Sequence, residues 1–322
     1  MSDAKVALIG LGAMTQRVHL PSLASFPDVH IVGACDLDRE RLDSVADRYG
    51  IEGRYTDYRQ MVEKTAPDGV YAVGQPHLMY DVWVWCLQQG LNLYVEKPLG
   101  LGRHQAQMLA TLAEDNGAIT QVSFQRRSSP LLAKMREACL ERGPIVHAVC
   151  EFYKCDPRPF WSPRDHMLDD GVHVIDTLRW ICGGEVEGTE SRCRRIGVPD
   201  INWFTATLHF STGATGVLLC NWASGRRVFR VQMHAPGIAC DADPETSAQL
   251  YADNRTEPDV HDAREVAGGD ELHVFGGFRQ KNREFVDSLL AGRELTTSPF
   301  RDAVKTMDVA DRILAQAALR GE

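Results

Sequence analysis

The stretch KVALIGLGAM at residues 5–14 indicates the fold class. Lys5–Ile9 is a nearly unbroken apolar run, as expected for a parallel strand covered on both faces. Gly10 then permits a tight turn, and Gly12 lets the backbone approach a pyrophosphate at the amino end of the next helix. Thr15 replaces the last glycine of the usual motif, which predicts slightly looser packing of helix on strand. The alternative is a plain strand–helix turn.

Beyond this stretch, short apolar runs alternate with helical segments as far as residue 122. Strands are predicted at 30–35, 69–73 and 92–95, and helices at 39–49 and 80–89. This alternation predicts a doubly wound parallel sheet, an α/β Rossmann domain spanning residues 1–122.

The pattern changes beyond residue 122. Alternating apolar residues predict strands at 146–152, 204–210 and 229–233, with a hairpin turn at 211–213 leading into the run 216–220. The stretch 277–320 is predicted to be helical, with a break near Ser298-Pro299. Residues 123–322 are therefore expected to form an α+β domain with a large, mainly antiparallel open sheet for substrate binding and oligomerisation.

Composition and charge narrow the range of partners. The 322 residues carry a formal net charge of -9, which disfavours nucleic acid and anionic membranes. No apolar run approaches the roughly 18 residues of a membrane span, and the nine cysteines include no C-x-x-C pair. We expect a cytoplasmic protein. The acidic segment 241–271 matches no ligand spacing, so it is interpreted as a solvated loop and no metal is predicted.

Asp36 favours a particular dinucleotide. It ends the second predicted strand 24 positions after Gly12, near the spacing of an acid that binds the adenosine ribose hydroxyls. A carboxylate there would repel a 2′-phosphate, so NAD is favoured over NADP. Arg39 and Arg41 lie nearby and leave NADP open. The alternative role for Asp36 is to cap the following helix.

Further motifs carry a resemblance to a known family. They are the glycine turn, Asp36, Gln75-Pro76 with Tyr80, Glu96-Lys97-Pro98, Gln125-Arg126-Arg127, the segment Leu168–Asp176, and Asn282–Asp287. In this order, over nearly the full length, they resemble the Gfo/Idh/MocA oxidoreductases, named after glucose–fructose oxidoreductase, inositol dehydrogenase and a rhizopine-catabolism protein.

The turn and the resemblance together predict the cofactor-binding residues. These are Gly10, Leu11, Gly12, Ala13, Met14, Asp36, Gln75, Pro76, His77, Glu96 and Lys97.

Lys97 is the first candidate catalytic residue. Oxidising an alcohol requires a base for the hydroxyl proton and a positive group near the oxygen. Lys97 follows a parallel strand, at the sheet edge where ligands bind, and could hold the hydroxyl. Glu96 could stabilise its ammonium or touch the nicotinamide ribose. The alternative for this pair is a surface ion pair in a loop.

Asp169 and His173 are the second candidate group. Four residues apart on a helix, they would share one face, and a carboxylate beside an imidazole supports a general base. The resemblance, through its D-x-x-x-H-x-x-D pattern, implies His173 as base and Asp169 as substrate contact or orienter. Asp176 is predicted to brace the helix.

Substrate-binding residues are predicted to be Lys97, Gln125, Arg126, Trp161, Asp169 and His173. Aromatic faces beside basic groups suit a sugar ring, and arginines suit a carboxylate or phosphate on it. The alternative is solvated arginines and a packed tryptophan.

The sequence thus predicts an NAD(P)-dependent oxidoreductase acting on a sugar, cyclitol or related polyol. Two other functions stay open: a cofactor-retaining glycosidase or epimerase that uses transient oxidation, and a non-catalytic NAD-binding sensor. The resemblance also implies a homodimer or homotetramer formed through the C-terminal sheet.

Overall fold

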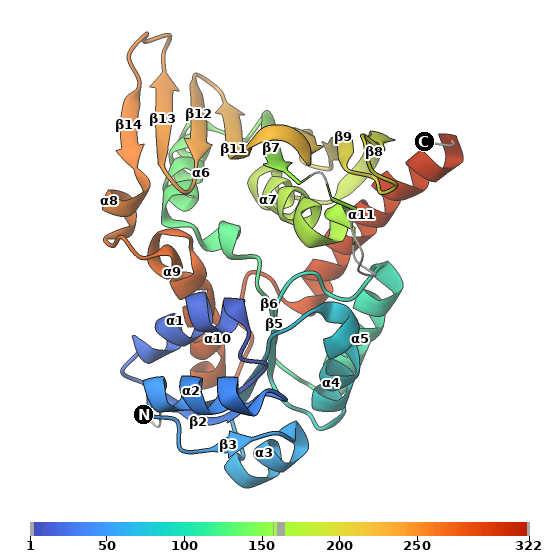
Figure 1. Ribbon diagram of the computed structural model, residues 1–322. Coiled ribbons are helices and arrows are strands. Elements are labelled where there is room, and N and C mark those ends of the chain that lie inside the picture. Colours follow the sequence, from blue (N-terminus) through green and yellow to red (C-terminus); the bar gives the residue numbers. More distant parts are fainter. Residues whose placement is uncertain (1–2, 157, 160–164, 321–322) are drawn as a thin grey trace. The chain divides into compact units, whose positions relative to one another are not determined.

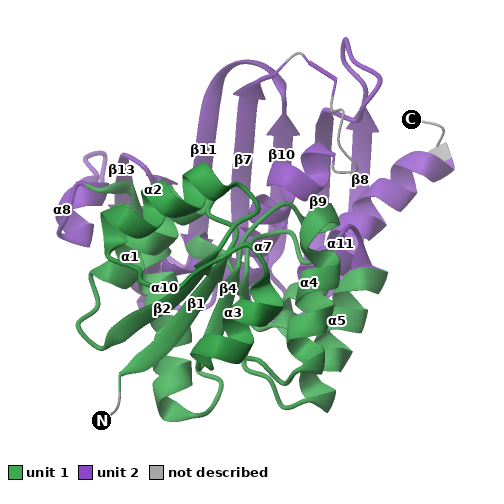
Figure 2. Cartoon of the chain, turned by 60° about the horizontal axis from the view of Figure 1, so that its bottom comes forward, with its two compact units in different colours: residues 1–100, 104–125, 271–304 green, residues 101–103, 126–270, 305–322 purple. Residues whose placement is uncertain are grey.

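A computed structural model describes residues 3–156, 158–159 and 165–320. The chain forms two compact units (Figure 2). Unit 1 comprises residues 1–100, 104–125 and 271–304, and unit 2 comprises residues 101–103, 126–270 and 305–322. Trp161 lies outside the described residues.

Unit 1 contains a six-stranded parallel sheet in the order β3-β2-β1-β4-β5-β6. The strands are β1 (Ala4–Ile9), β2 (Val29–Cys35), β3 (Arg54–Tyr55), β4 (Gly69–Ala72), β5 (Leu93–Val95) and β6 (Thr120–Val122). The central strand β1 pairs with β2 on one side and β4 on the other, so that Ile9 lies beside both Cys35 and Ala72. The predicted doubly wound Rossmann sheet is confirmed (Figure 1).

Helices cover this sheet because their apolar faces complete its core. They are η1 (Thr15–His19, π-helical), α1 (Leu20–Ala24), α2 (Arg39–Tyr49), α3 (Tyr58–Thr65), α4 (Pro76–Gln88), α5 (Arg103–Asp115), α9 (Leu272–Phe275) and α10 (Phe278–Ala291). In α2, Asp38 caps the amino end and Gly50 ends the helix in the left-handed conformation. Leu42 and Val45 of the same helix are buried against the sheet core.

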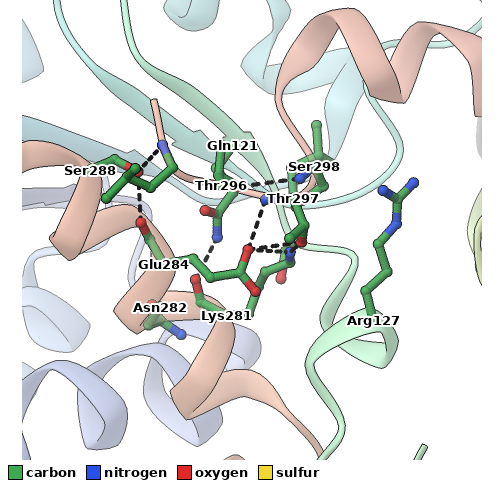
Figure 3. A network of polar contacts seen from close by, with 12 residues as sticks. Gln121, Arg127, Lys281, Asn282, Glu284, Ser288, Thr296, Thr297 and Ser298 are labelled. Carbon is green, nitrogen blue, oxygen red and sulfur yellow. Dashed lines mark hydrogen bonds and ion pairs between the residues drawn. The ribbon is translucent and has the colours of Figure 1, made fainter. Parts of the chain in front are cut away.

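The segment 271–304 belongs to unit 1, whereas the sequence pattern placed it in a second domain beginning at residue 123. Phe285 of α10 packs edge-on against Tyr71, with ring centroids 5.4 Å apart. The fully buried ammonium of Lys281 pairs with Glu284 at 2.9 Å and with the hydroxyl of Thr297 at 2.8 Å. Gln121 donates to the Lys281 carbonyl at 2.5 Å, which fastens the segment to β6 (Figure 3).

Unit 2 contains an eight-stranded sheet in the order β14-β13-β12-β11-β7-β10-β9-β8. The strands are β7 (His147–Cys155), β8 (Val186–Arg194), β9 (Trp203–Phe210), β10 (Thr215–Asn221), β11 (Ala223–Ala235), β12 (Ile238–Asp243), β13 (Ser247–Ala252) and β14 (Asp259–Asp262). Only the β7–β10 pair is parallel among the described pairs. The predicted mainly antiparallel sheet is confirmed. The solvated loop predicted for 241–271 is wrong, because alternating small residues such as Ala242 and Ala248 bury one face of β12 and β13.

The remaining helices belong to unit 2, except that η2 and α11 begin in unit 1. They are η2 (Gln125–Ser128, 3-10), α6 (Pro130–Arg142), η3 (Met167–Gly171, π-helical), α7 (Val172–Cys182), α8 (Ala263–Ala267) and α11 (Phe300–Arg320). No described helix is long and apolar enough to cross a membrane. Among the described residues, no three or more His, Cys, Asp or Glu side chains form a group that could hold a metal ion.

Candidate active site

Gly10 adopts a backbone conformation that other residues avoid. Its φ is +84°, and an added Cβ would lie 2.1 Å from the carbonyl oxygen of Val73. Thr15, in the position where the motif usually has glycine, is fully buried and donates its hydroxyl to the Gly10 carbonyl at 2.7 Å. The threonine therefore closes the turn with a hydrogen bond between helix and strand end.

Gly12 differs, because nothing lies within 4 Å of the place where its Cβ would stand. The neighbouring Ala13 is exposed and begins the helical segment that continues through η1. This open backbone with free space at a helix start fits a diphosphate, which hydrogen-bonds to amide groups and gains from the helix dipole.

Asp36 is bound to the same turn. Its Oδ2 accepts from the amide of Leu11 at 2.7 Å, and its Oδ1 accepts from Asp38 at 2.9 Å. The alternative role, capping α2, is wrong, since Asp38 accepts from the Arg41 amide there. Arg41 pairs with Asp38 at 2.6 Å and stays 3.9 Å from Asp36. Asp36 thus presents a carboxylate beside the glycine turn, which fits ribose hydroxyls.

Glu96 is positioned by a residue that the sequence analysis missed. His19 is fully buried, and its Nε2 lies 2.8 Å from Oε1 of Glu96 while its Nδ1 lies 3.3 Å from Asn282. The other Glu96 oxygen accepts from the Lys97 amide at 3.3 Å. No local pattern reveals this contact, because Asn282 is 263 residues from His19.

The other predicted cofactor residues lie at the start of α4. Pro76 occupies its first turn, where a missing amide hydrogen is tolerated. Gln75 is exposed and His77 is half-buried. The strand end carrying Lys97 is followed by a cis peptide bond to Pro98. Met14 packs against the core cluster of unit 1.

In unit 2, Asp169 and His173 lie on two different kinds of helix. The predicted helix is present, but it begins with the π-helical turn η3, which holds Asp169, and His173 is the second residue of the α-helix α7 that follows. Close packing accompanies the π turn: a Cβ on Gly171 would lie 2.8 Å from Met167 and 2.9 Å from Phe204. His173 is 7% exposed and Asp169 is half-buried.

Asp176 has the bracing contacts predicted for it. Its carboxylate accepts two bonds from Arg127, at 2.8 and 2.5 Å, and one from Thr306 at 3.1 Å. This buried pair joins η2 to α7.

A second buried carboxylate, Asp170, was not predicted. It pairs with Lys154 of β7 and accepts from the indole of Trp222 at 3.3 Å. The Trp222 ring also stacks on His166, with centroids 4.6 Å apart, and burial lowers the pKa of that histidine. Sequence spacing could not reveal this group, since Lys154, Asp170 and Trp222 come from separate parts of the chain.

Two models of known protein families match this chain. A family model described as "Oxidoreductase family, NAD-binding Rossmann fold" matches residues 4–124, and a model of the Gfo/Idh/MocA C-terminal domain matches residues 141–235. The chain belongs to the Gfo/Idh/MocA family. It is an oxidoreductase with an NAD-binding Rossmann fold, as the resemblance implied.

Individual relatives are distant. A myo-inositol 2-dehydrogenase of Thermotoga maritima is 26% identical over 66% of this chain and 67% of its own length. A D-glucoside 3-dehydrogenase of Escherichia coli is 22% identical over 85% of each chain. A crystal structure of a dehydrogenase from Chromobacterium violaceum superposes with a TM-score of 0.90 at 22% identity, covering 100% of this chain and 97% of the other. This last likeness supports the fold.

Proposed function

We propose that this protein is an NAD-dependent dehydrogenase or reductase that acts on a secondary hydroxyl, or the corresponding carbonyl, of a sugar or cyclitol. The placement of Lys97 carries the proposal. It follows β5, and the glycine turn follows β1, so both occupy the carboxyl edge of one parallel sheet. Ligands of open α/β sheets bind at that edge.

The residues have distinct proposed roles. When bound, NAD supplies the hydride acceptor or donor, held by the glycine turn and by Asp36. The Lys97 ammonium hydrogen-bonds the reacting oxygen and favours its negative charge. Glu96, held by His19, stands beside that lysine. A ring nitrogen of His173 takes the hydroxyl proton during oxidation and returns it during reduction, and Asp169 contacts the substrate or orients the imidazole.

The names of two relatives support the substrate class. The relatives are named as dehydrogenases of myo-inositol and of D-glucosides, both of which carry ring hydroxyls. Gln125 and Arg126 are proposed to contact this substrate, and Trp161 stays a prediction.

The first test replaces Lys97 with Met. We expect turnover with a panel of sugars and cyclitols to fall by about three orders of magnitude or more, with NAD binding measured by calorimetry nearly unchanged. Lys64→Met, an exposed residue of α3, is the matched control. An equal loss of NAD affinity would overturn the role given to Lys97. Turnover without net NADH would instead indicate redox-neutral glycoside chemistry.

His173→Asn tests the base. The variant should lose the pH dependence of the chemical step, followed by single-turnover kinetics across pH 5–9. His209→Asn, on the exposed part of β9, should keep the profile of the parent protein. An unchanged profile in His173→Asn would exclude this residue as the base.

We also propose that a second copy of this chain covers the open face of the unit 2 sheet. Half-buried Val149, Val217 and Leu219 gather there on the paired strands β7 and β10, flanked by the Arg230–Asp241 ion pair. A face combining apolar and paired charged groups is suited to self-association through a two-fold axis. Leu219→Asp should reduce the mass measured by analytical ultracentrifugation to that of one chain, whereas Thr111→Asp, on the exposed part of α5 in unit 1, should leave the mass unchanged. A single-chain mass for the parent protein would contradict the proposal.

A further inference from the structure

Arg126 has an unusual environment for an arginine. It is only 7% exposed. Its guanidinium carbon lies 3.4 Å from the centre of the Phe229 ring and 5.7 Å from that of Phe152. Among the described residues, its Nε has no hydrogen-bond partner, and no carboxylate forms an ion pair with it. Burial lowers its pKa to about 10, which still leaves it charged at neutral pH. A buried charge without a partner is costly.

The neighbouring cations are already paired. Among the described residues, two cations besides Arg126 lie near the Phe152 ring: Lys154 Nζ is 5.0 Å and Arg227 Cζ 5.8 Å from its centre. Lys154 pairs with Asp170, and Arg227 forms two bonds with Glu245 at 2.6 and 2.7 Å. Lys154 and Arg227 therefore each have an acid within hydrogen-bond distance, and Asp243 adds negative charge near Arg227, whereas the described residues form no ion pair with Arg126. Residues 157 and 160–164 lie outside the described part of the chain, and their sequence contains no Asp or Glu.

The chain holds this arginine close to the proposed chemistry of unit 2. The next residue, Arg127, is bound to Asp176 of α7, three residues after His173. Asp170, the partner of Lys154, adjoins Asp169. The backbone of η2 is therefore fastened to the helix that carries the proposed base, while the Arg126 side chain turns to the phenylalanine rings.

We propose that Arg126 binds an anionic group of the substrate, a carboxylate or a phosphate carried by the sugar or cyclitol. The planar guanidinium offers two parallel N–H donors to such a group. Stacking on Phe229 fixes the plane of the fork, and Lys154 and Arg227 add positive potential around it. This inference rests on the proposed function for the sugar class, but the binding of the anion can be measured without turnover.

The test compares a hexose, the corresponding hexuronate and the corresponding hexose phosphate. For the parent protein we expect kcat/KM to be at least about tenfold higher for one of the two acids than for the hexose. Arg126→Gln should abolish that preference through KM, so that kcat/KM for the acid falls to no more than the value that the same variant shows for the hexose. Arg126→Lys, which keeps the charge but not the fork, should retain a smaller part of it. The kcat/KM values of the hexuronate and the hexose phosphate show which of the two anions is preferred.

Two controls keep the outcomes distinct. Arg136→Gln removes another arginine stacked on an aromatic ring, that of Trp180 at 5.0 Å, and should leave the preference intact. Calorimetry of each acid with the NAD-saturated protein measures binding directly. Binding lost only in Arg126→Gln, without turnover of any sugar, would support the anion site and overturn the proposed function. Equal binding and turnover of hexose and acids by the parent protein would overturn the anion site and leave the function standing.

Discussion

Gly10 and Gly12 belong to one turn, yet a side chain would have different consequences at the two positions. At Gly10 the left-handed backbone and the Val73 carbonyl both exclude a Cβ. At Gly12 the space is open, so the absence of a side chain there has no packing reason inside the described chain. A motif glycine can therefore serve either the fold or a ligand, and the structure separates the two roles.

This difference gives a paired prediction. Gly10→Ala should lower the free energy of unfolding by about 3 kcal/mol or more, from backbone strain and steric overlap. Gly12→Ala should change it by about 1 kcal/mol or less and weaken NAD binding about tenfold or more, because the methyl group occupies the place of the diphosphate. Urea denaturation and calorimetry measure the two quantities. Unchanged NAD affinity in Gly12→Ala would argue against a diphosphate at this turn.

At the scale of elements, ion pairs connect separate helices and strands, and they differ in burial. Arg127 and Asp176 are 7% and 1% exposed and join η2 to α7. Arg230 and Asp241 form a similar contact between β11 and β12, but Arg230 is 46% exposed. Burial raises the cost of losing one partner, because the remaining charge can no longer reach water.

The two pairs should respond unequally to the same change. Arg127→Leu is expected to destabilise the protein by about 3 kcal/mol, since the buried Asp176 loses its two-bond partner and keeps the Thr306 hydroxyl at 3.1 Å and a longer contact with Arg179 at 3.9 Å. Arg230→Leu should cost less than about 1 kcal/mol. Thermal and urea unfolding of both variants checks this. Equal losses would mean that burial does not govern these pairs.

At the scale of the whole molecule, the Rossmann unit is assembled from separate parts of the chain. Phe285 and Val286 of the segment 271–304 lie in the same core cluster as Leu8 and Tyr71. Lys281, at 0% exposure, donates to Glu284 and Thr297 of the same segment. A boundary drawn at the first 122 residues leaves this core open on one side.

A fragment experiment tests this organisation. Residues 1–125 alone should lack a cooperative unfolding transition, because the Tyr71 and Tyr94 rings lose the packing of Phe285. Joining residues 271–299 to that fragment through a flexible linker should restore the transition and NAD binding. Cooperative unfolding of the shorter fragment, with the same midpoint as the joined one, would contradict the assignment.

Much of the fold could be inferred from local patterns. Apolar runs such as Lys5–Ile9 and the glycine turn after them specify a parallel strand and its loop, and alternation marks β7 and β9 in the same way. Asp36 and Lys97 follow strands, so their sheet edge could also be predicted from order alone. These features depend on residues close together in sequence, where periodicity and turn chemistry act directly.

The tertiary structure decided those features that depend on contacts between residues far apart in the sequence. The contact of His19 with Glu96 and Asn282, the membership of 271–304 in unit 1, and the π turn packed on Phe204 all join residues more than 30 positions apart. The charge balance around Arg126 is of the same kind, since Phe229 and Glu245 come from remote strands and turns. Burial and pairing are properties of the packed chain, so no local pattern contains them.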